Sequence, residues 1–81
     1  MATVKVDETL DVRGLICPYP LIEAREKLKT MRKGQVLEVI SDYKPAAETT
    51  IPYFCQKKGY PVEIIQEAES LWRLYIERTD D

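Results

Sequence analysis

The residue with the most distinctive chemistry in this sequence is Cys17, which is followed by proline at positions 18 and 20. A cysteine reacts as its thiolate, and the start of a helix favours negative charge through its dipole and its unpaired amide hydrogens. Pro18 suits the first position of a helix, so we expect Cys17 at or beside the N-cap, with a thiol pKa below the ordinary cysteine value. Pro18 and Pro20 would stiffen this junction, and Gly14 supplies a flexible point before it. These features indicate a nucleophilic cysteine, the alternative being a small cysteine that only packs.

Few other side chains in the sequence offer chemistry. Histidine is absent, and two cysteines alone make a poor zinc site, so neither a metal nor another cofactor is expected. Arg13 is a candidate to bind an anion or a persulfide, although such an arginine is more often only a solvated charge. Cys55 is expected to be a packed thiol rather than a redox partner of Cys17. Tyr19 borders the cysteine in sequence, but an aromatic residue at a helix start more often covers the core.

The elements that must position Cys17 are indicated by hydrophobic periodicity. Apolar residues alternate from Thr3 to Val12 in the manner of a strand, which Glu8 interrupts. From about Pro18 to Lys33, apolar residues recur three and four positions apart, which predicts an amphipathic helix that ends before Gly34. Basic residues gather toward its end and complement the helix dipole, with docking of a partner as the alternative role. They are Lys27, Lys29, Arg32 and Lys33.

The second half of the chain predicts three more strands and one more helix. Gln35 to Ser41 is a dense apolar run, typical of a central strand. A helical stretch follows from about Pro45 to Lys58, in which Pro52 must cause a kink or begin a second part. The last two strands are marked by Val62, Ile64 and Ile65 and by the alternation from Leu71 to Arg78, with a turn over residues 67–70.

These elements predict an α/β fold with the order β-α-β-α-β-β. Right-handed crossovers would place both helices on one face of a mixed four-stranded sheet, as a two-layer sandwich whose last two strands form a hairpin. A chain of 81 residues is long enough for one compact core, so we expect residues 1–81 to form a single domain. Hydrophobic residues make up 44% and charged residues 32%, a balance typical of a folded soluble protein.

Charge and hydropathy limit the classes of function. The net charge of −2 gives no global attraction to phosphate backbones, so nucleic-acid binding is not expected. The N-terminus has no basic stretch followed by an apolar core, and no apolar run approaches the length of a membrane span. We therefore expect a cytoplasmic protein that is not itself embedded in a membrane.

The segment around Cys17 also resembles the signature of a known family. The pattern Asp11-x-x-Gly14-Leu15-x-Cys17-Pro18-x-Pro20 is similar to the CPxP motif region of the TusA/SirA-like sulfur carriers. The resemblance covers nearly the whole chain, and the predicted element order agrees with the two-layer α/β fold of that family. Its further points are Gly34, the strand ending at Asp42, Ile51-Pro52-x-Phe54-Cys55 and Gly59. The resemblance implies that Cys17 is the catalytic nucleophile, which accepts a sulfane sulfur, carries it as a persulfide and presents it to an acceptor protein.

The run from Cys17 to Ala24 looks closest to the YeeD branch of this family, whose members accompany a YeeE-type membrane transporter for thiosulfate uptake. This resemblance implies thiosulfate or a protein persulfide as the sulfur donor, and a sulfurtransferase activity in which Cys17 cleaves thiosulfate. It leaves open whether the protein turns over or carries one sulfur per encounter. The alternative function is a regulatory or interaction subunit in which Cys17 is only structural.

Overall fold

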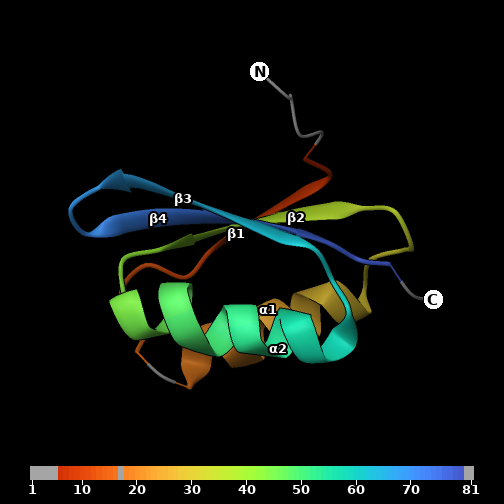
Figure 1. Ribbon diagram of the computed structural model, residues 1–81, viewed down its shortest axis with the longest axis horizontal. Coiled ribbons are helices and arrows are strands. Elements are labelled where there is room, and N and C mark those ends of the chain that lie inside the picture. Colours follow the sequence, from red (N-terminus) through yellow and green to blue (C-terminus); the bar gives the residue numbers. More distant parts are fainter. Residues whose placement is uncertain (1–5, 17, 80–81) are drawn as a thin grey trace.

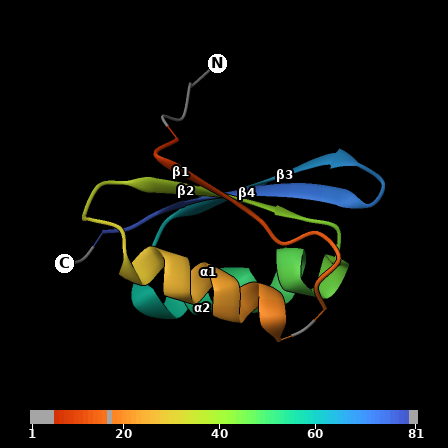
Figure 2. The same cartoon turned by 180° about the vertical axis from the view of Figure 1, so that it is seen from behind.

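The structure, a computed structural model, describes residues 6–16 and 18–79 and has the two layers that the sequence predicts. Four strands form one sheet in the order β1-β2-β4-β3, and both helices lie against the same face (Figure 1). The view from behind shows the same two layers, and no helix or strand of the described residues lies against the other face of the sheet (Figure 2). The strands are β1 (Glu8–Asp11), β2 (Val36–Ser41), β3 (Val62–Ala68) and β4 (Leu71–Glu77). The helical segments are α1 (Tyr19–Lys29), the π-helical η1 (Ala46–Thr50) and α2 (Ile51–Lys58).

The sheet is mixed because its strands are connected in two different ways. Strand β1 pairs parallel to β2, since α1 carries the chain back between them. Strand β4 pairs antiparallel to both β2 and β3, and the β3–β4 pair is the predicted hairpin. The predictions of a mixed sheet and of a central strand at β2 are therefore confirmed.

The hydrophobic core lies between the sheet and the helices. Alternate residues of β2 and β4 are buried there, as the predicted strand periodicity requires. The helices contribute their apolar sides, with Ala24 and Leu28 from α1 and Ile51 from α2, each at most 2% exposed. None of the helices in the described part of the chain is long and apolar enough to cross a membrane.

Helix α1 is shorter than its periodicity predicts, because it ends at Lys29 and not at Lys33. The hydroxyl of Thr30 donates a hydrogen bond to a carbonyl of the last turn at 2.7 Å. The guanidinium of Arg78, which follows β4, donates to the carbonyl of Leu28 at 2.5 Å. These side chains satisfy carbonyls that a longer helix would have bonded, so the chain turns early.

The second helical stretch is divided into two parts, as the position of Pro52 predicts. Pro52 occupies the first turn of α2, where its missing N–H costs no intrahelical hydrogen bond. Before it, the Ile51 N–H donates to the carbonyl of Ala46, the longer spacing of a π-helix. Pro52 has no N–H to donate to the carbonyl four residues earlier. This missing donor accounts for the change from π-helical to α-helical hydrogen bonding at this point.

Two strand boundaries also differ from the predicted ones. Strand β1 begins at Glu8, and residues 3–5 of the predicted strand, which was to run from Thr3 to Val12, lie outside the described residues. Strand β3 continues through Glu67 to Ala68, so the turn of the hairpin is shorter than predicted. The side-chain bond from Gln66 Nε2 to the Glu69 carbonyl, at 3.1 Å, closes this shorter turn.

Cys55 lies on the inner side of α2, fully buried in the core, so its prediction as a packed thiol is confirmed. Burial raises the pKa of this thiol to about 12, because the thiolate would lose its hydration. An exposed cysteine has a pKa of about 8.5. The folded protein therefore keeps Cys55 protonated at pH values where the unfolded chain ionises it.

We predict that native Cys17→Ser protein resists alkylation by iodoacetamide at about pH 8.5, whereas the same protein in urea reacts at Cys55. Because the unfolded state releases a proton that the native state keeps, Cys55 should lower the free energy of unfolding as the pH rises from about 9 toward 12. Urea titrations at several pH values measure this loss, and it should be smaller in Cys55→Ala protein. Rapid alkylation of the native Cys17→Ser protein would contradict the buried position.

Candidate functional site

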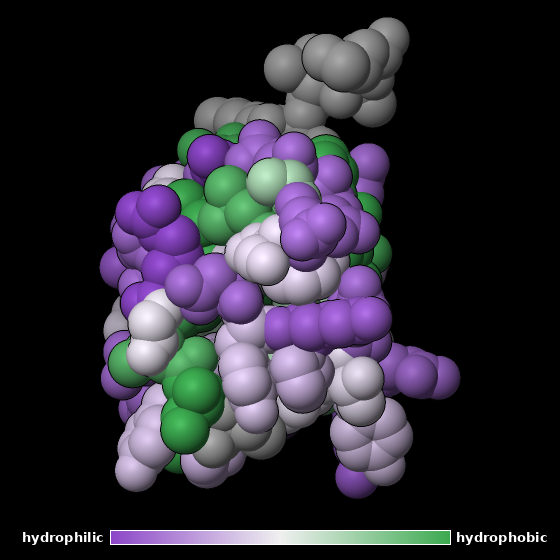
Figure 3. All heavy atoms as spheres, turned by 90° about the vertical axis from the view of Figure 1, so that its left-hand side faces the viewer, coloured by the Kyte–Doolittle hydropathy of each residue, from purple (hydrophilic) through white to green (hydrophobic). Residues whose placement is uncertain are grey.

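The candidate site lies at the edge of the sheet where β1 and β2 end and α1 begins. Because β1 and β2 are parallel and α1 returns antiparallel to them, these three ends meet. The connecting loop spans residues 12–18, and Cys17 itself lies outside the described residues. Figure 3 shows this end of the molecule, with hydrophobic and hydrophilic side chains interspersed on its surface. The site is therefore built from the neighbours of Cys17.

The loop starts with a tight turn at Gly14. The Leu15 N–H donates to the carbonyl of Val12 at 3.1 Å, which closes a four-residue turn. Gly14 has φ of +87°, the left-handed value that a type II turn requires at its third position and that glycine adopts most easily. The Gly14 N–H donates to Oδ1 of Asp42 at 3.0 Å. Asp42 therefore ties this turn to the end of β2.

Pro18 is the N-cap of α1 and Tyr19 is the first helical residue, so the helix begins one residue later than the predicted start at Pro18. The first four amide positions of a helix have no partner within it. Pro18 and Pro20 carry no N–H, and the Tyr19 N–H donates to the carbonyl of Ile16 at 2.9 Å. Among the described positions of this first turn, Leu21 alone retains an N–H that could face an anion. The helix start therefore has fewer unpaired amide groups than the sequence analysis predicted. The reason is that Pro18 and Pro20, which stiffen the junction, have no N–H.

Exposure separates the residues around Cys17 into two groups. Ile16 is 59% exposed and Tyr19 is 57% exposed, while Pro18 is also on the surface. Pro20 is fully buried and anchors the helix start in the core. The expectation that Tyr19 covers the core is wrong, since it is the second proline that fills this role. A large apolar side chain on each side of Cys17 is therefore available for contact with another molecule.

Arg13, the predicted anion-binding residue, forms an ion pair with Asp11. Its Nη2 lies 2.8 Å from Oδ2 of Asp11, and its Nε lies 3.0 Å from Oδ1. The hydrogen bonds from Arg13 lower the pKa of the Asp11 carboxyl to about 2, so the pair stays charged at neutral pH. Nε and Nη2 donate to the Asp11 carboxylate, and Nη1 makes no hydrogen bond with a described residue.

Asp42 and Asp11 also belong to this site, although the sequence analysis named them only as points of the family resemblance and gave them no role. The buried Ser41 hydroxyl accepts the N–H of Tyr43 at 3.1 Å and so turns the chain just after β2. This turn places Asp42 beside Gly14, a residue 28 positions away. The available signal was the position of Asp42 directly after a buried strand, at the edge where the parallel strands end.

The basic residues near the end of α1 lie away from this site. Lys27 pairs with Glu8 of β1 at 3.1 Å, and Lys29 pairs with Glu26 at 3.3 Å. Both lysines stand in the last turn of α1, where they complement the negative end of the helix. These contacts agree with the structural role predicted for this cluster.

Comparisons with known proteins agree on the family of this chain. The model of the sulfurtransferase TusA family matches residues 8–78. A candidate sulfur carrier of Thermotoga maritima is 43% identical over 77 residues, covering 94% of this chain and 96% of the relative. YedF of Escherichia coli strain K12, also named as a candidate sulfur carrier, is 35% identical over 78 residues, covering 96% of this chain and all of the relative.

A solved structure shares the fold. The crystal structure of a SirA-like protein from Desulfitobacterium hafniense superposes with a TM-score of 0.80 and covers 90% of this chain and 99% of its own. Its sequence is only 23% identical, so the likeness concerns the fold. The chain therefore belongs to the TusA sulfurtransferase family, and sulfur transfer is the general class of its function.

Proposed function

We propose that Cys17 is the sulfur-carrying nucleophile of this protein and that it acts in the cytoplasm on sulfur derived from thiosulfate. The observation that carries the proposal is the exposure of Ile16, Pro18 and Tyr19 on both sides of Cys17, on a loop tied to β2 through Asp42. A carrier thiol must be reachable by a donor and then by an acceptor. An exposed loop held at one end meets that need, since it presents the thiol in a narrow range of positions.

The proposed chemical step needs no oxidant or reductant. The Cys17 thiolate attacks the outer sulfur of thiosulfate, the sulfur–sulfur bond of thiosulfate breaks, and sulfite leaves with the bonding electrons. The product is a Cys17 persulfide, whose terminal sulfur then passes to a thiolate or another nucleophile on an acceptor protein. A protein persulfide as donor would deliver its sulfur by the same attack.

Both reactants are negatively charged, so the site must offset their repulsion. The positive end of α1 and the Leu21 N–H lie at the helix start beside position 17. Arg13 adds a guanidinium whose Nη1 makes no hydrogen bond with Asp11. We assign Arg13 to binding the sulfonate oxygens of thiosulfate, and Gly14, Pro18 and Pro20 to shaping the loop.

A YeeE-type membrane transporter is the proposed source of thiosulfate, on the basis of the run from Cys17 to Ala24. In this arrangement the transporter delivers thiosulfate and the protein takes its outer sulfur. The exposed Ile16 and Tyr19 side chains would contact the transporter or the acceptor protein, since large exposed apolar residues commonly mark such contacts.

We predict that incubation with thiosulfate adds one sulfur atom to Cys17 and releases sulfite, and that Cys17→Ser protein gains nothing. Mass spectrometry of the intact protein and of its peptides measures the adduct. Cys55→Ala protein is the matched control, because it removes the buried thiol and should keep the adduct. A folded Cys17→Ser protein that fully supports sulfur uptake in cells would contradict the proposal and favour an interaction subunit.

The Asp42 hydrogen bond to Gly14 should affect the rate of this reaction. Asp42→Ala removes the acceptor and loosens the loop, and we expect persulfide formation to slow about fivefold, the equivalent of about 1 kcal/mol. Asp42→Asn keeps an oxygen acceptor and should stay within about twofold of the original rate. Glu69→Ala, in the hairpin turn, controls for loss of a surface carboxylate. If Asp42→Asn slows the reaction as much as Asp42→Ala, the hydrogen bond is not the cause.

Arg13 and Asp11 should change thiosulfate binding in opposite directions. Arg13→Gln removes the cation, and we expect the half-saturating concentration of thiosulfate to rise about fivefold with little change in the saturated rate. Asp11→Asn releases the guanidinium from its ion pair and should lower that concentration. The initial rate of sulfite release in a single turnover, measured over a range of thiosulfate concentrations, tests both variants. An unchanged half-saturating concentration in Arg13→Gln protein would remove Arg13 from the site.

A further inference from the structure

The uncovered face of the sheet is a second surface with its own chemistry. Both helices lie against the other face, so nothing in the described chain covers this one (Figures 1 and 2). The strand register aligns Thr9, Glu38, Tyr75 and Glu63 in one row across all four strands. Glu38 is the centre of this row, since it accepts hydrogen bonds from the Tyr75 hydroxyl at 2.9 Å and the Thr9 hydroxyl at 3.2 Å.

The charge of the sheet is strongly one-sided. Arg73 is the single basic residue in the four strands, and it is already paired with Glu38 at 3.1 Å and with Glu67. The acidic residues on the uncovered face are Asp11, Glu38, Glu63, Glu67 and Glu77, whereas Glu8 lies in register with the buried Leu37 and pairs with Lys27 of α1. Arg13 follows β1 and is paired with Asp11, and four further basic residues, Arg25, Lys29, Lys58 and Arg78, line one hollow beside the helices. The uncovered face is therefore acidic on a protein whose net charge is only −2.

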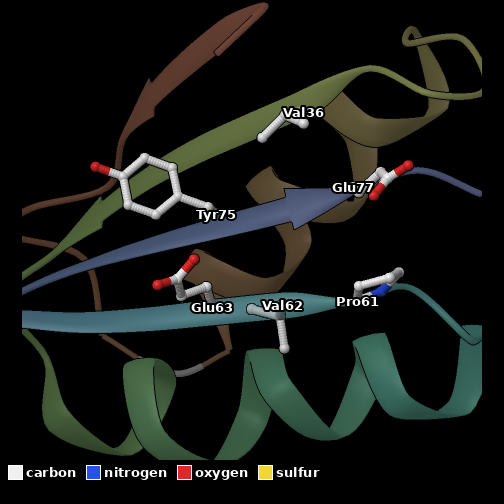
Figure 4. A pocket seen from close by; sticks show the side chains of 6 residues that line it. All are labelled: Val36, Pro61, Val62, Glu63, Tyr75 and Glu77. Carbon is white, nitrogen blue, oxygen red and sulfur yellow. The ribbon is translucent and has the colours of Figure 1, made fainter. Parts of the chain in front are cut away.

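A shallow hollow of about 200 Å³ lies on this face, at the end of the sheet where β2 and β3 begin and β4 ends. Figure 4 shows its lining: Val36, Pro61, Val62, Glu63, Tyr75 and Glu77. The middle of the hollow is apolar, and two carboxylates stand at its sides. Glu63 and Glu77 form no ion pair with any described residue, in contrast to Glu38 and Glu67.

We propose that this hollow and the acidic sheet face bind a basic segment of another protein, one that inserts a lysine or arginine side chain. The aliphatic stem of such a side chain would pack on Val36, Pro61 and the ring of Tyr75, and its cationic end would lie between Glu63 and Glu77. Charge complementarity selects this occupant, because Glu63 and Glu77 have no ion-pair partner among the described residues and Arg73 is already paired with Glu38 and Glu67.

This docking surface is separate from the Cys17 loop. Val36 begins β2 and Asp42 follows its other end, so the six residues of the strand place them about 20 Å apart. A partner bound at the hollow would leave the loop open to a second molecule. The proposal consequently does not depend on the role of Cys17, and Cys17→Ser protein should bind the same segment unchanged.

The test uses the full chain and a short peptide in which lysine alternates with leucine, with the same peptide carrying glutamate in place of lysine as its counterpart. We expect the lysine peptide to shift the NMR amide signals of Val36, Glu63, Tyr75 and Glu77, and the glutamate peptide to shift none of them. Fluorescence anisotropy should show about tenfold weaker binding to Glu63→Gln/Glu77→Gln protein, and weaker binding at higher salt. Thermal unfolding of this double variant should match the original, since both side chains are exposed.

The matched control is Glu23→Gln/Glu26→Gln, which removes the same charge from the surface of α1. It should leave peptide binding within about twofold if the sheet face is the site. Equal weakening in both double variants would show attraction to net charge alone and overturn the proposal. Peptide-induced shifts confined to the helices would also overturn it. So would concentration-dependent self-association that Glu63→Gln/Glu77→Gln abolishes, because the occupant would then be a second copy of this chain.

Discussion

The candidate site depends on one constraint, the parallel pairing of β1 with β2 through the helix that connects them. This pairing brings the ends of both strands and the start of α1 to a single edge of the sheet. The hydrogen bond from Gly14 to Asp42 uses that proximity, since it joins the first residues after β1 to the first residue after β2. The positive φ of Gly14 makes the amide available in that direction. Without the parallel register, the loop that leads to Cys17 would have no fixed point on the sheet.

The rigidity of the site has an electrostatic consequence. Two prolines in the first turn of α1 fix the backbone but remove two amide donors, and the Tyr19 N–H is used by Ile16. Arg13 shares its charge with Asp11. The described neighbours therefore offer an anion one amide, that of Leu21, and one guanidinium that already pairs with Asp11.

The periodicity of the sequence was sufficient for the architecture but not for the ends of the elements. Helix faces, the alternation of β4 and the burial of Cys55 depend on local patterns of apolar residues, so they were predicted. The early end of α1 depends on Arg78, a residue after the last strand, which no local pattern could connect to Leu28. The same holds for Asp42 and Gly14, which are 28 positions apart. Side-chain bonds between distant residues form only once the fold exists.

Of the proposed site residues, the sequence indicated those whose type alone restricts the backbone. Gly14, Pro18 and Pro20 could be recognised in this way, since glycine permits a positive φ and proline fixes a negative one. The position of Arg13, four residues before Cys17, was enough to make it a candidate for anion binding. Its ion pair with Asp11 could not be predicted, because the two side chains meet only when the loop is folded. The prediction that Tyr19 covers the core was wrong because Pro20, the next residue, is the one that is buried at the start of α1. The hydrophobic periodicity does not show which of these two neighbouring residues faces the core.

A two-layer fold of this size cannot cover both faces of its sheet, so the outer face must be compatible with water. Val36, Ile40 and Tyr75 are only partly exposed there and lie among carboxylates, which keeps the apolar area divided. Like charges on two such faces repel, so the carboxylates also oppose stacking between copies of the chain. The same repulsion does not act on a basic partner. The charge of this face therefore disfavours binding of a second copy of the chain and favours binding of a cationic segment. The hydrophobic core does not need this face, because the helices supply the other half of the core.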